Sequence, residues 1–171
     1  GLFTKEIEEQ LLRGEIHIAV HSMKDLPTIL PDGLTIGAVP AREDARDVLV
    51  STRYRSVDEL PTGARVATSS IRRKVQLLAR RPDLQIVEIR GNVGTRLQKA
   101  ADFDAIILAA AGLKRLGLKT EHHPLDFDVM IPAVGQGAIA CEVRADDFET
   151  QELLAGINDA DTLACVEAER V

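Results

Sequence analysis

Ala105-Ile-Ile-Leu-Ala-Ala110 is the stretch that decides the fold class. A short apolar run of this kind is typical of a strand covered on both faces, as in a parallel sheet. Further strands are expected upstream at 65–68 and 84–89, and the stretches between the strands, 71–81 and 93–100, have helical spacing. Strands separated by helices indicate parallel βαβ units. We therefore expect an α/β protein with mainly parallel sheets.

The alternation of strand and helix continues on both sides of this stretch. A short helical turn is expected at 56–60, and residues 119–132 are expected to form a long irregular connection. Segments 40–46 and 132–137 combine Pro, Gly and charge, which favours crossings of the chain between two lobes. The other expected elements are helices over 1–13, 111–116, 148–157 and 162–171 and strands over 16–20, 34–39, 47–51 and 137–143.

Composition and charge exclude several classes of function. The chain has 171 residues, of which 45% are hydrophobic and 28% charged, as in ordinary globular proteins. Aromatic residues make up only 3% and the net charge is −6, so we expect no nucleic-acid binding and no attraction to anionic membranes. No apolar run approaches the length that crosses a bilayer. Cys141 and Cys165 form no CxxC or metal-type cluster, so we expect a reducing cytoplasm and no metal site.

The most informative polar motif is His21-Ser-Met-Lys-Asp-Leu-Pro27, which follows an expected strand. Open α/β proteins bind ligands at the ends of their strands. Ser22, Lys24 and Asp25 are therefore candidate site residues, with Asp25 the best candidate for acid–base chemistry or for stabilising a cation. The alternative is a strand end with a Lys–Asp pair in solvent.

A second motif, Thr68-Ser-Ser-Ile-Arg-Arg-Lys74, opens the helix expected at 71–81. A serine is a normal N-cap, but cations in the first turn oppose the helix dipole by about 0.3–1 kcal/mol each. Hydroxyls, free N–H groups and two guanidiniums there would form a pocket for a carboxylate or phosphate. The alternative is that these cations turn to solvent or pair with acidic neighbours.

Three weaker motifs follow. Arg90-Gly-Asn-Val-Gly-Thr-Arg96 lies between a strand and a helix and is neither a Walker P-loop nor a dinucleotide fingerprint, so a tight βα turn is a strong alternative. Ala111-Gly-Leu-Lys-Arg-Leu-Gly117 contains Arg115, for which a solvated helix surface is the default interpretation. Pro132-Ala-Val-Gly-Gln-Gly137 supplies one amide, Gln136. Arginines at βα turns predict a ligand that carries several carboxylates.

Together, these five motifs resemble the porphobilinogen deaminase family, also called hydroxymethylbilane synthase. Their order and spacing match over essentially the whole chain. The resemblance implies a transferase of tetrapyrrole biosynthesis, the route to haem and chlorophyll. Such enzymes join four porphobilinogens head to tail, release ammonia and give linear hydroxymethylbilane. The partners implied are porphobilinogen and the growing polypyrrole, and the family is typically monomeric and cytoplasmic.

The resemblance also implies roles for individual residues. Asp25 would be the central catalytic carboxylate, which binds pyrrole N–H groups and stabilises the cationic azafulvene left when the amine departs. A dipyrromethane cofactor would be bound through its carboxylates and pyrroles, and substrate carboxylates would be bound in the same way. The residues expected to bind the cofactor are Ser22, Lys24, Asp25, Thr68, Ser69, Ser70, Arg72, Arg73 and Arg90, and those expected to bind substrate are Arg72, Arg96, Arg115 and Gln136.

The family fold has three α/β domains, of which the first two resemble type II periplasmic binding proteins. By resemblance, residues 1–40 and 138–156 belong to the first domain and residues 46–131 form the second. Residues 157–171 would be a helix leading toward the third domain. The family carries its cofactor on a cysteine in a Gly-Gly-Cys loop of that domain, and neither Cys141 nor Cys165 has this context. The family's N-terminal strand and helix are also missing, so we expect a fragment that is inactive alone.

Two other functions remain open. A non-enzymatic two-lobed module that captures a small polycarboxylate would need the arginines but not Asp25. A hydrolase that uses Ser22 as nucleophile and Lys24 as base is a more distant alternative.

Overall fold

The computed structural model describes residues 2–171, with side chains from Thr4 onward. By its internal contacts the chain forms two compact units. Unit 1 contains the residues up to Glu43 together with Val134–Val171, and unit 2 is the continuous stretch Asp44–Ala133. The three-domain assignment implied by the family resemblance stays a prediction.

Unit 1 is built on a three-stranded sheet of order β1-β8-β2, with β1 at Ala19–Ser22, β8 at Ile139–Arg144 and β2 at Leu34–Ala38. Both ladders are antiparallel, with Ala19 opposite Glu142 and Thr35 opposite Val143. This sheet differs from the expected parallel pairing, because its central strand comes from the far end of the chain and runs against both neighbours. The strand expected at 16–20 also lies later, since His21 and Ser22 pair with β8.

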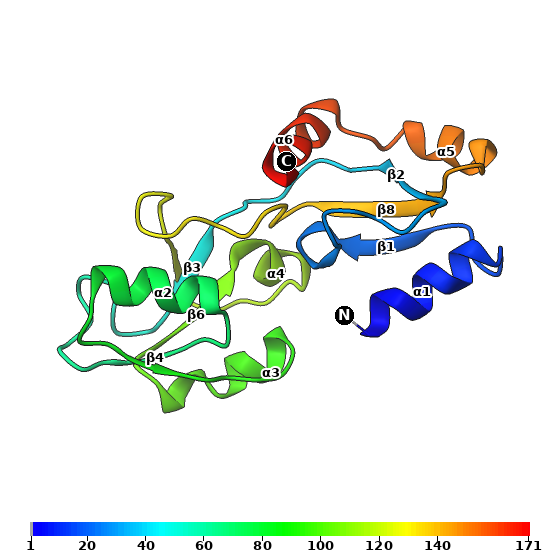
Figure 1. The fold of residues 1–171 in the computed structure, drawn as a ribbon. Helices are drawn as coiled ribbons and strands as arrows, with labels where there is room; N and C mark the ends of the chain where they lie inside the picture. Colours follow the sequence, from blue (N-terminus) through cyan, green and yellow to red (C-terminus); the bar gives the residue numbers. More distant parts are fainter. Residues whose placement is uncertain (1) are drawn as a thin grey trace. The chain divides into compact units, whose positions relative to one another are not determined.

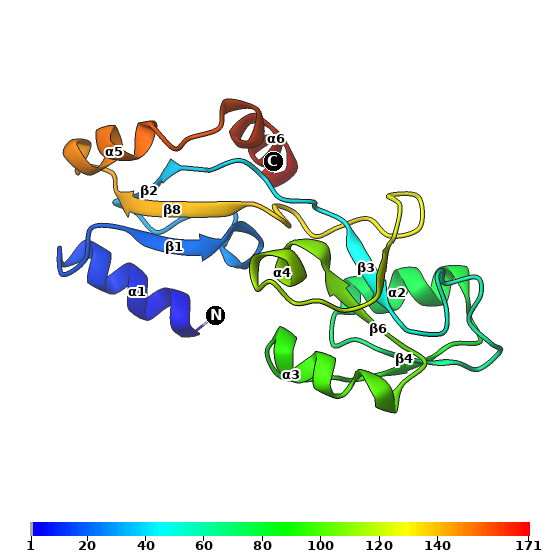
Figure 2. The same cartoon turned by 180° about the vertical axis from the view of Figure 1, so that it is seen from behind.

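Helices cover both faces of this sheet (Figures 1 and 2). Helix α1 (Leu2–Leu12) packs Leu11 against Ala19 and Leu34 on one face. Helix α5 (Phe148–Ala155) packs Leu154 against Cys141 and Val143 on the other. Helix α6 (Ala160–Arg170) adds Val166 to a third apolar cluster, and a single 3₁₀ turn, η1 (Met23–Asp25), follows β1. Met23, the first residue of η1, is buried in the same cluster as Val166.

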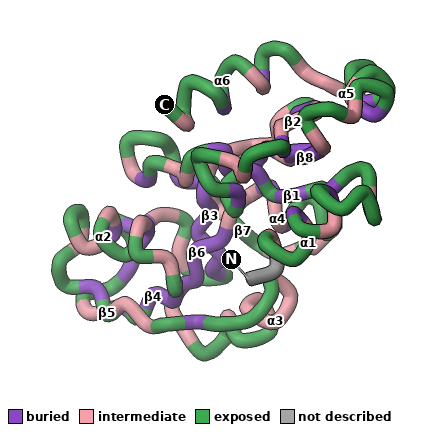
Figure 3. The backbone as a smooth tube through the Cα atoms, turned by 45° about the vertical axis from the view of Figure 1, so that its right-hand side comes forward, coloured by how far each residue is buried: buried purple, intermediate pink, exposed green. Residues whose placement is uncertain are grey.

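Unit 2 contains a five-stranded sheet of order β5-β4-β6-β3-β7. Its strands are β3 (Asp47–Val50), β4 (Arg65–Ala67), β5 (Gln85–Val87), β6 (Ala105–Ala109) and β7 (His122–Pro124). The expected parallel pairing is confirmed where β4 meets β5 and β6, whereas β3 pairs antiparallel with β6 and β7. Figure 3 shows buried residues along β3, β4 and β6. The apolar run at 105–110 is thus the middle of the sheet, as expected.

Helices lie on both faces of the unit 2 sheet. Helix α2 (Ile71–Arg80) packs Leu77 against Leu49, Val66 and Ile107. The opposite face, formed by Val48, Val50, Ile106 and Leu108, is covered by α3 (Val93–Gln98) and α4 (Ala110–Arg115). A 3₁₀ turn, η2 (Ala100–Asp102), follows α3.

The predicted α/β fold class is confirmed, with two local corrections. The segment expected to be irregular at 119–132 contains β7, because the backbone of His122–Pro124 pairs with β3 despite its polar side chains. Residues 56–60 form turns and bends rather than helix. Within residues 2–171, none of the helices is both long and apolar enough to cross a bilayer.

Candidate functional site

The Ser22–Asp25 turn presents polar side chains at the end of β1. Met23 is fully buried, and its N–H donates to the Ala138 carbonyl at 3.0 Å. The Leu26 N–H donates to the Met23 carbonyl at 3.2 Å, and Leu26 is also buried. Ser22, Lys24 and Asp25 are consequently exposed on a turn that two buried apolar side chains hold in place.

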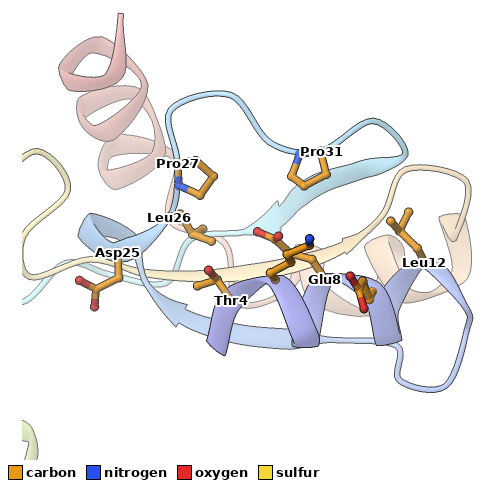
Figure 4. Close-up of a pocket in the computed structure, with 9 residues that line it drawn as sticks. Thr4, Glu8, Leu12, Asp25, Leu26, Pro27 and Pro31 are labelled. Atoms are coloured by element: carbon orange, nitrogen blue, oxygen red, sulfur yellow. The ribbon is translucent and has the colours of Figure 1, made fainter. Parts of the chain in front are cut away.

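Asp25 lines two concave sites of unit 1. One has a volume of about 620 Å³ and includes His21, Ser22 and Lys24, so the structure brings the three residues of the first motif together. The other has a volume of about 580 Å³ and lies between α1 and the segment that follows η1. Figure 4 shows Thr4, Glu8 and Leu12 on α1 along one side, Leu26, Pro27 and Pro31 along the other, and Asp25 at one end.

Gln136 lies in the interior of unit 1. Only 1% of the residue is exposed, and its backbone carbonyl accepts a hydrogen bond from Arg42 Nε at 2.9 Å. Arg42 in turn forms an ion pair with Glu169 of α6, and Glu169 Oε2 accepts from the Gly135 N–H at 2.8 Å. This segment is therefore tied to α6, and the substrate-binding role of the Gln136 side chain stays a prediction.

The hydroxyls at the start of α2 are engaged locally. Ser70 is the N-cap, and its Oγ accepts from the Arg73 N–H at 3.4 Å. Thr68 Oγ1 accepts from the Ser70 N–H at 3.2 Å. Ser69 Oγ donates to the Ile89 carbonyl at 2.5 Å and accepts from the Ile89 N–H at 3.2 Å. These bonds give the helix start a fixed geometry, and the anion-binding role of the three hydroxyls remains a prediction.

The two arginines of this motif meet at a carboxylate that the sequence analysis did not single out. Asp47, the first residue of β3, is fully buried. Its Oδ1 accepts from Arg73 Nε at 3.1 Å and Nη2 at 2.7 Å, and its Oδ2 lies 2.7 Å from Arg72 Nη2. Arg73 also donates to the Ile107 carbonyl at 3.0 Å. The arginines therefore pair with an acidic group, as the alternative interpretation allowed, and Asp47 orients them.

Arg72 and Arg73 differ in their access to solvent. The side chain of Arg73 is 8% exposed, and burial lowers its pKa, an effect that Asp47 opposes. The side chain of Arg72 is 25% exposed. Arg72 is thus the better placed of the two to contact a ligand, and Arg73 is placed to support it.

The remaining predicted arginines lie on the surface of unit 2. The side chain of Arg90 is 86% exposed, with Glu88 at 3.5 Å. Gly91, which follows it, has φ of 115°, a conformation that favours glycine. Arg96 donates from Nε to the Gly91 carbonyl at 2.8 Å, and Asn92 caps α3 by accepting from the Thr95 N–H. Arg115 is exposed at the end of α4.

The structure distributes the predicted residues over both units. Ser22, Lys24, Asp25 and Gln136 belong to unit 1, and all the others belong to unit 2. Among the residues that the structure describes, no group of three or more His, Cys, Asp or Glu side chains could hold a metal ion.

Comparisons with known proteins agree with the resemblance seen in the motifs. Residues 1–152 match the family model described as "Porphobilinogen deaminase, dipyromethane cofactor binding domain". The porphobilinogen deaminase of Acidithiobacillus ferrooxidans is 57% identical over 173 residues, and that of Geobacillus kaustophilus is 57% identical over 174. Each match covers 99% of this chain and 56% of the relative, so the chain spans about half the length of these curated relatives.

Solved structures share the fold at low sequence identity. A periplasmic substrate-binding protein of an ABC transporter from Coxiella burnetii is 15% identical, with a TM-score of 0.58 over 95% of this chain and 79% of its own. A nutrient-binding protein from Burkholderia cenocepacia bound to methionine is 14% identical, with a TM-score of 0.58 over 91% and 76%. These neighbours confirm the expected likeness to type II periplasmic binding proteins in fold alone.

Proposed function

This chain belongs to the porphobilinogen deaminase family, and from that membership we propose that its protein is a hydroxymethylbilane synthase of tetrapyrrole biosynthesis. The proposed reaction joins four porphobilinogens head to tail, with loss of one ammonia each, and one water adds to the terminal methylene to give linear hydroxymethylbilane. Because the chain covers 56% of its relatives, the activity is proposed for the whole protein, and these 171 residues alone are expected to be inactive.

The observation that carries the proposal is the placement of Asp25. Its carboxylate is exposed on the wall of both concave sites, on a turn anchored by Met23 and Leu26. A fixed anion stabilises positive charge that develops next to it, and it does so without reorganising at the moment of reaction. When ammonia leaves the aminomethyl group of porphobilinogen, the remaining pyrrole becomes a cation. Asp25 accepts hydrogen bonds from pyrrole N–H groups and stabilises that cation.

The arginines of unit 2 fit ligands that carry many carboxylates. Each porphobilinogen has an acetate and a propionate, and guanidinium groups bind carboxylates through two parallel hydrogen bonds. Arg72, Arg90 and Arg115 each expose part or all of the side chain. The matched family model is named for binding the dipyrromethane cofactor, and these side chains suit its carboxylates. When bound, the cofactor supplies the terminal pyrrole to which the growing polypyrrole is attached.

The roles of the other residues follow from their surroundings. Ser22 and Lys24 lie beside Asp25 and bind carboxylate groups near the reacting pyrrole. Arg96, held by the Gly91 carbonyl, binds substrate carboxylates. Arg73 acts through Arg72 and Asp47, because its guanidinium is turned to the interior. We place the enzyme in the cytoplasm as a monomer, with porphobilinogen and the growing polypyrrole as its small-molecule partners.

The test uses the longest natural form of the protein with its cofactor loaded. Porphobilinogen is supplied, and uroporphyrin-type absorbance is followed after acidification and oxidation. Asp25→Asn should lower kcat by about 100-fold to 1,000-fold, the usual effect of removing one preorganised electrostatic group. Asp32→Asn, a matched change at an exposed aspartate of the same unit, should leave kcat unchanged.

The outcomes separate the two functions considered. Absence of turnover in the loaded wild-type protein would sink the deaminase proposal and favour a binding module for a small polycarboxylate. If Asp25→Asn turned over porphobilinogen as fast as wild type, the deaminase activity would be supported but the catalytic role of Asp25 would be wrong.

A further inference from the structure

A buried acid–imidazole pair lies directly behind the Asp25 turn. His21 Nε2 and Glu142 Oε2 are 3.0 Å apart, and their side chains are 6% and 0% exposed. His21 is at the end of β1 and Glu142 is in the middle of β8, the central strand of unit 1. Neither residue has a role in the proposed function, although a buried titratable pair is expensive to maintain without one.

The sheet register explains how the two side chains meet. Ala19 and His21 are the buried positions of β1, and Ala19 lies opposite Glu142 while His21 lies opposite Ala140. Ala19 packs under α1, so this face of the sheet is the one that α1 covers. Glu8 of α1 is buried with 8% exposure, and its electrostatic effect on Glu142 is repulsive. Three titratable side chains thus gather under α1.

The pair ties the start of the Asp25 turn to the sheet. Ser22 is held on both sides: the side chain of His21 bonds to Glu142, and the N–H of Met23 bonds to the Ala138 carbonyl. His21 also lines the 620 Å³ concave site together with Asp25. A change in the pair would therefore reach the position and the electrostatic surroundings of Asp25.

Among the described residues, Glu8 of α1 acts electrostatically on Glu142. Lys24 and Asp25 of η1 line the same concave site as His21. Arg144, two residues after Glu142 on β8, donates instead to Asp147 and to backbone carbonyls of residues 11 and 16. Burial raises the pKa of Glu142, His21 lowers it and Glu8 raises it. Oε1 of Glu8 and Oε1 of Glu142 are buried and accept no hydrogen bond from the residues that the structure describes. Such a site favours retention of a proton.

We propose that His21 and Glu142 are a positioning pair for Asp25 that shares one proton and keeps the Ser22–Asp25 turn in its catalytic geometry. With that proton the pair is electrically neutral. Loss of the proton leaves a second negative charge behind Asp25 and beside Glu8, which disfavours the packed arrangement of the turn. This inference rests on the proposed deaminase function, because it assigns the pair to the same reaction.

The test compares four forms of the longest natural protein with cofactor loaded: wild type, Glu142→Gln, His21→Gln and Glu6→Gln. Glu142→Gln keeps a hydrogen-bond acceptor for His21 Nε2 but removes the charge. Glu6→Gln is the matched control, an identical change at an exposed residue of α1. The values of kcat and KM for porphobilinogen are measured over the range in which histidine titrates, about pH 5 to 8, and slightly above it. Histidine ring signals are followed by NMR over the same range.

We expect the kcat of wild type to fall about tenfold toward the alkaline end, with KM little changed. Glu142→Gln should lose most of this alkaline fall, because its pair gains no negative charge when the proton leaves. The His21 ring signals should change their pH dependence in Glu142→Gln but not in Glu6→Gln.

A wild-type pH profile of kcat in Glu142→Gln would overturn the inference, even if the variant were less stable, because a purely structural role would leave the pH dependence of kcat unchanged. Lack of turnover in wild type would instead overturn the proposed function, and the NMR titration would still report on the pair.

Discussion

Replacing Asp47 by asparagine should loosen the middle of unit 2. The carboxylate is fully buried, receives two hydrogen bonds from Arg73 and forms an ion pair with Arg72. Removing one partner of a buried ion pair costs about 3–5 kcal/mol, because a charge stays buried without compensation. The asparagine oxygen can still accept one bond from Arg73, so we expect the lower value, about 3 kcal/mol.

This loss is large compared with the stability of the unit. Domains are stable by about 0.05–0.15 kcal/mol per residue, which gives about 5–13 kcal/mol for a unit of about 90 residues. Hydrogen exchange read by mass spectrometry on peptides from β3 and β6 measures the change locally in the whole protein. A loss of about 3 kcal/mol in the free energy of unfolding corresponds to about 150-fold faster exchange at amides that exchange only when the core opens.

The control is Asp58→Asn, which breaks an exposed ion pair with Arg80, whose partners are 58% and 40% exposed. Exposed pairs contribute about 0–1 kcal/mol, so exchange in β3 and β6 should change less than about fivefold. If Asp47→Asn behaved like Asp58→Asn, the view of Asp47 as the buried anchor of both arginines would be wrong.

Three further changes have expected outcomes. Gly135→Ala places a Cβ 2.5 Å from Met23 Cγ at a φ of 66°. It should lower the free energy of thermal unfolding by about 1–3 kcal/mol. It should also lower kcat, because it displaces Met23, which anchors the Asp25 turn. Burial raises the pKa of Glu142 above its ordinary 4.5, so its contribution to stability is full below about pH 4.5 and is lost as pH rises through the raised value. In urea titrations, the free energy of unfolding of Glu142→Gln should therefore rise relative to that of wild type as pH increases from 4 to 7. A difference between the two free energies that stays constant with pH would contradict this. Ser70→Ala should lower the stability of α2 by about 0.5–2 kcal/mol, seen as faster exchange of its first-turn amides.

Local patterns predicted most of the elements but not every pairing. The apolar run at 105–110 predicted β6, and the helical spacing of residues 71–81 predicted α2. Both predictions succeeded because burial and periodicity are encoded in neighbouring residues. The antiparallel pairing of β8 was not predictable in this way, since strand direction depends on which distant segment becomes the neighbour. Strand β7 was missed because its side chains, including Pro124, oppose a strand, and only its backbone pairing with β3 defines it.

The candidate site was predicted where chemistry is concentrated in one motif. Ser22, Lys24 and Asp25 lie together because they share one turn. Asp47 was missed because it lies 26 positions from Arg73 along the chain. Glu142 was missed as well. The sequence carried a signal for both carboxylates, because Asp47 starts the otherwise apolar strand β3 and Glu142 interrupts the apolar strand β8. A carboxylate in such a place requires a cationic or protonated partner.

The strand order of unit 1 has a consequence for the synthesis of the chain. Strands β1 and β2 both pair with β8 and not with each other, and β8 ends about 100 residues after β2. Ribosomes add about 5–20 residues per second, so both strands wait about 5–20 s with unpaired edges. Unit 2 is continuous and is made entirely during that interval. The nascent chain therefore carries two open strand edges at the time when unit 2 can fold, and this is when holding chaperones would protect it most.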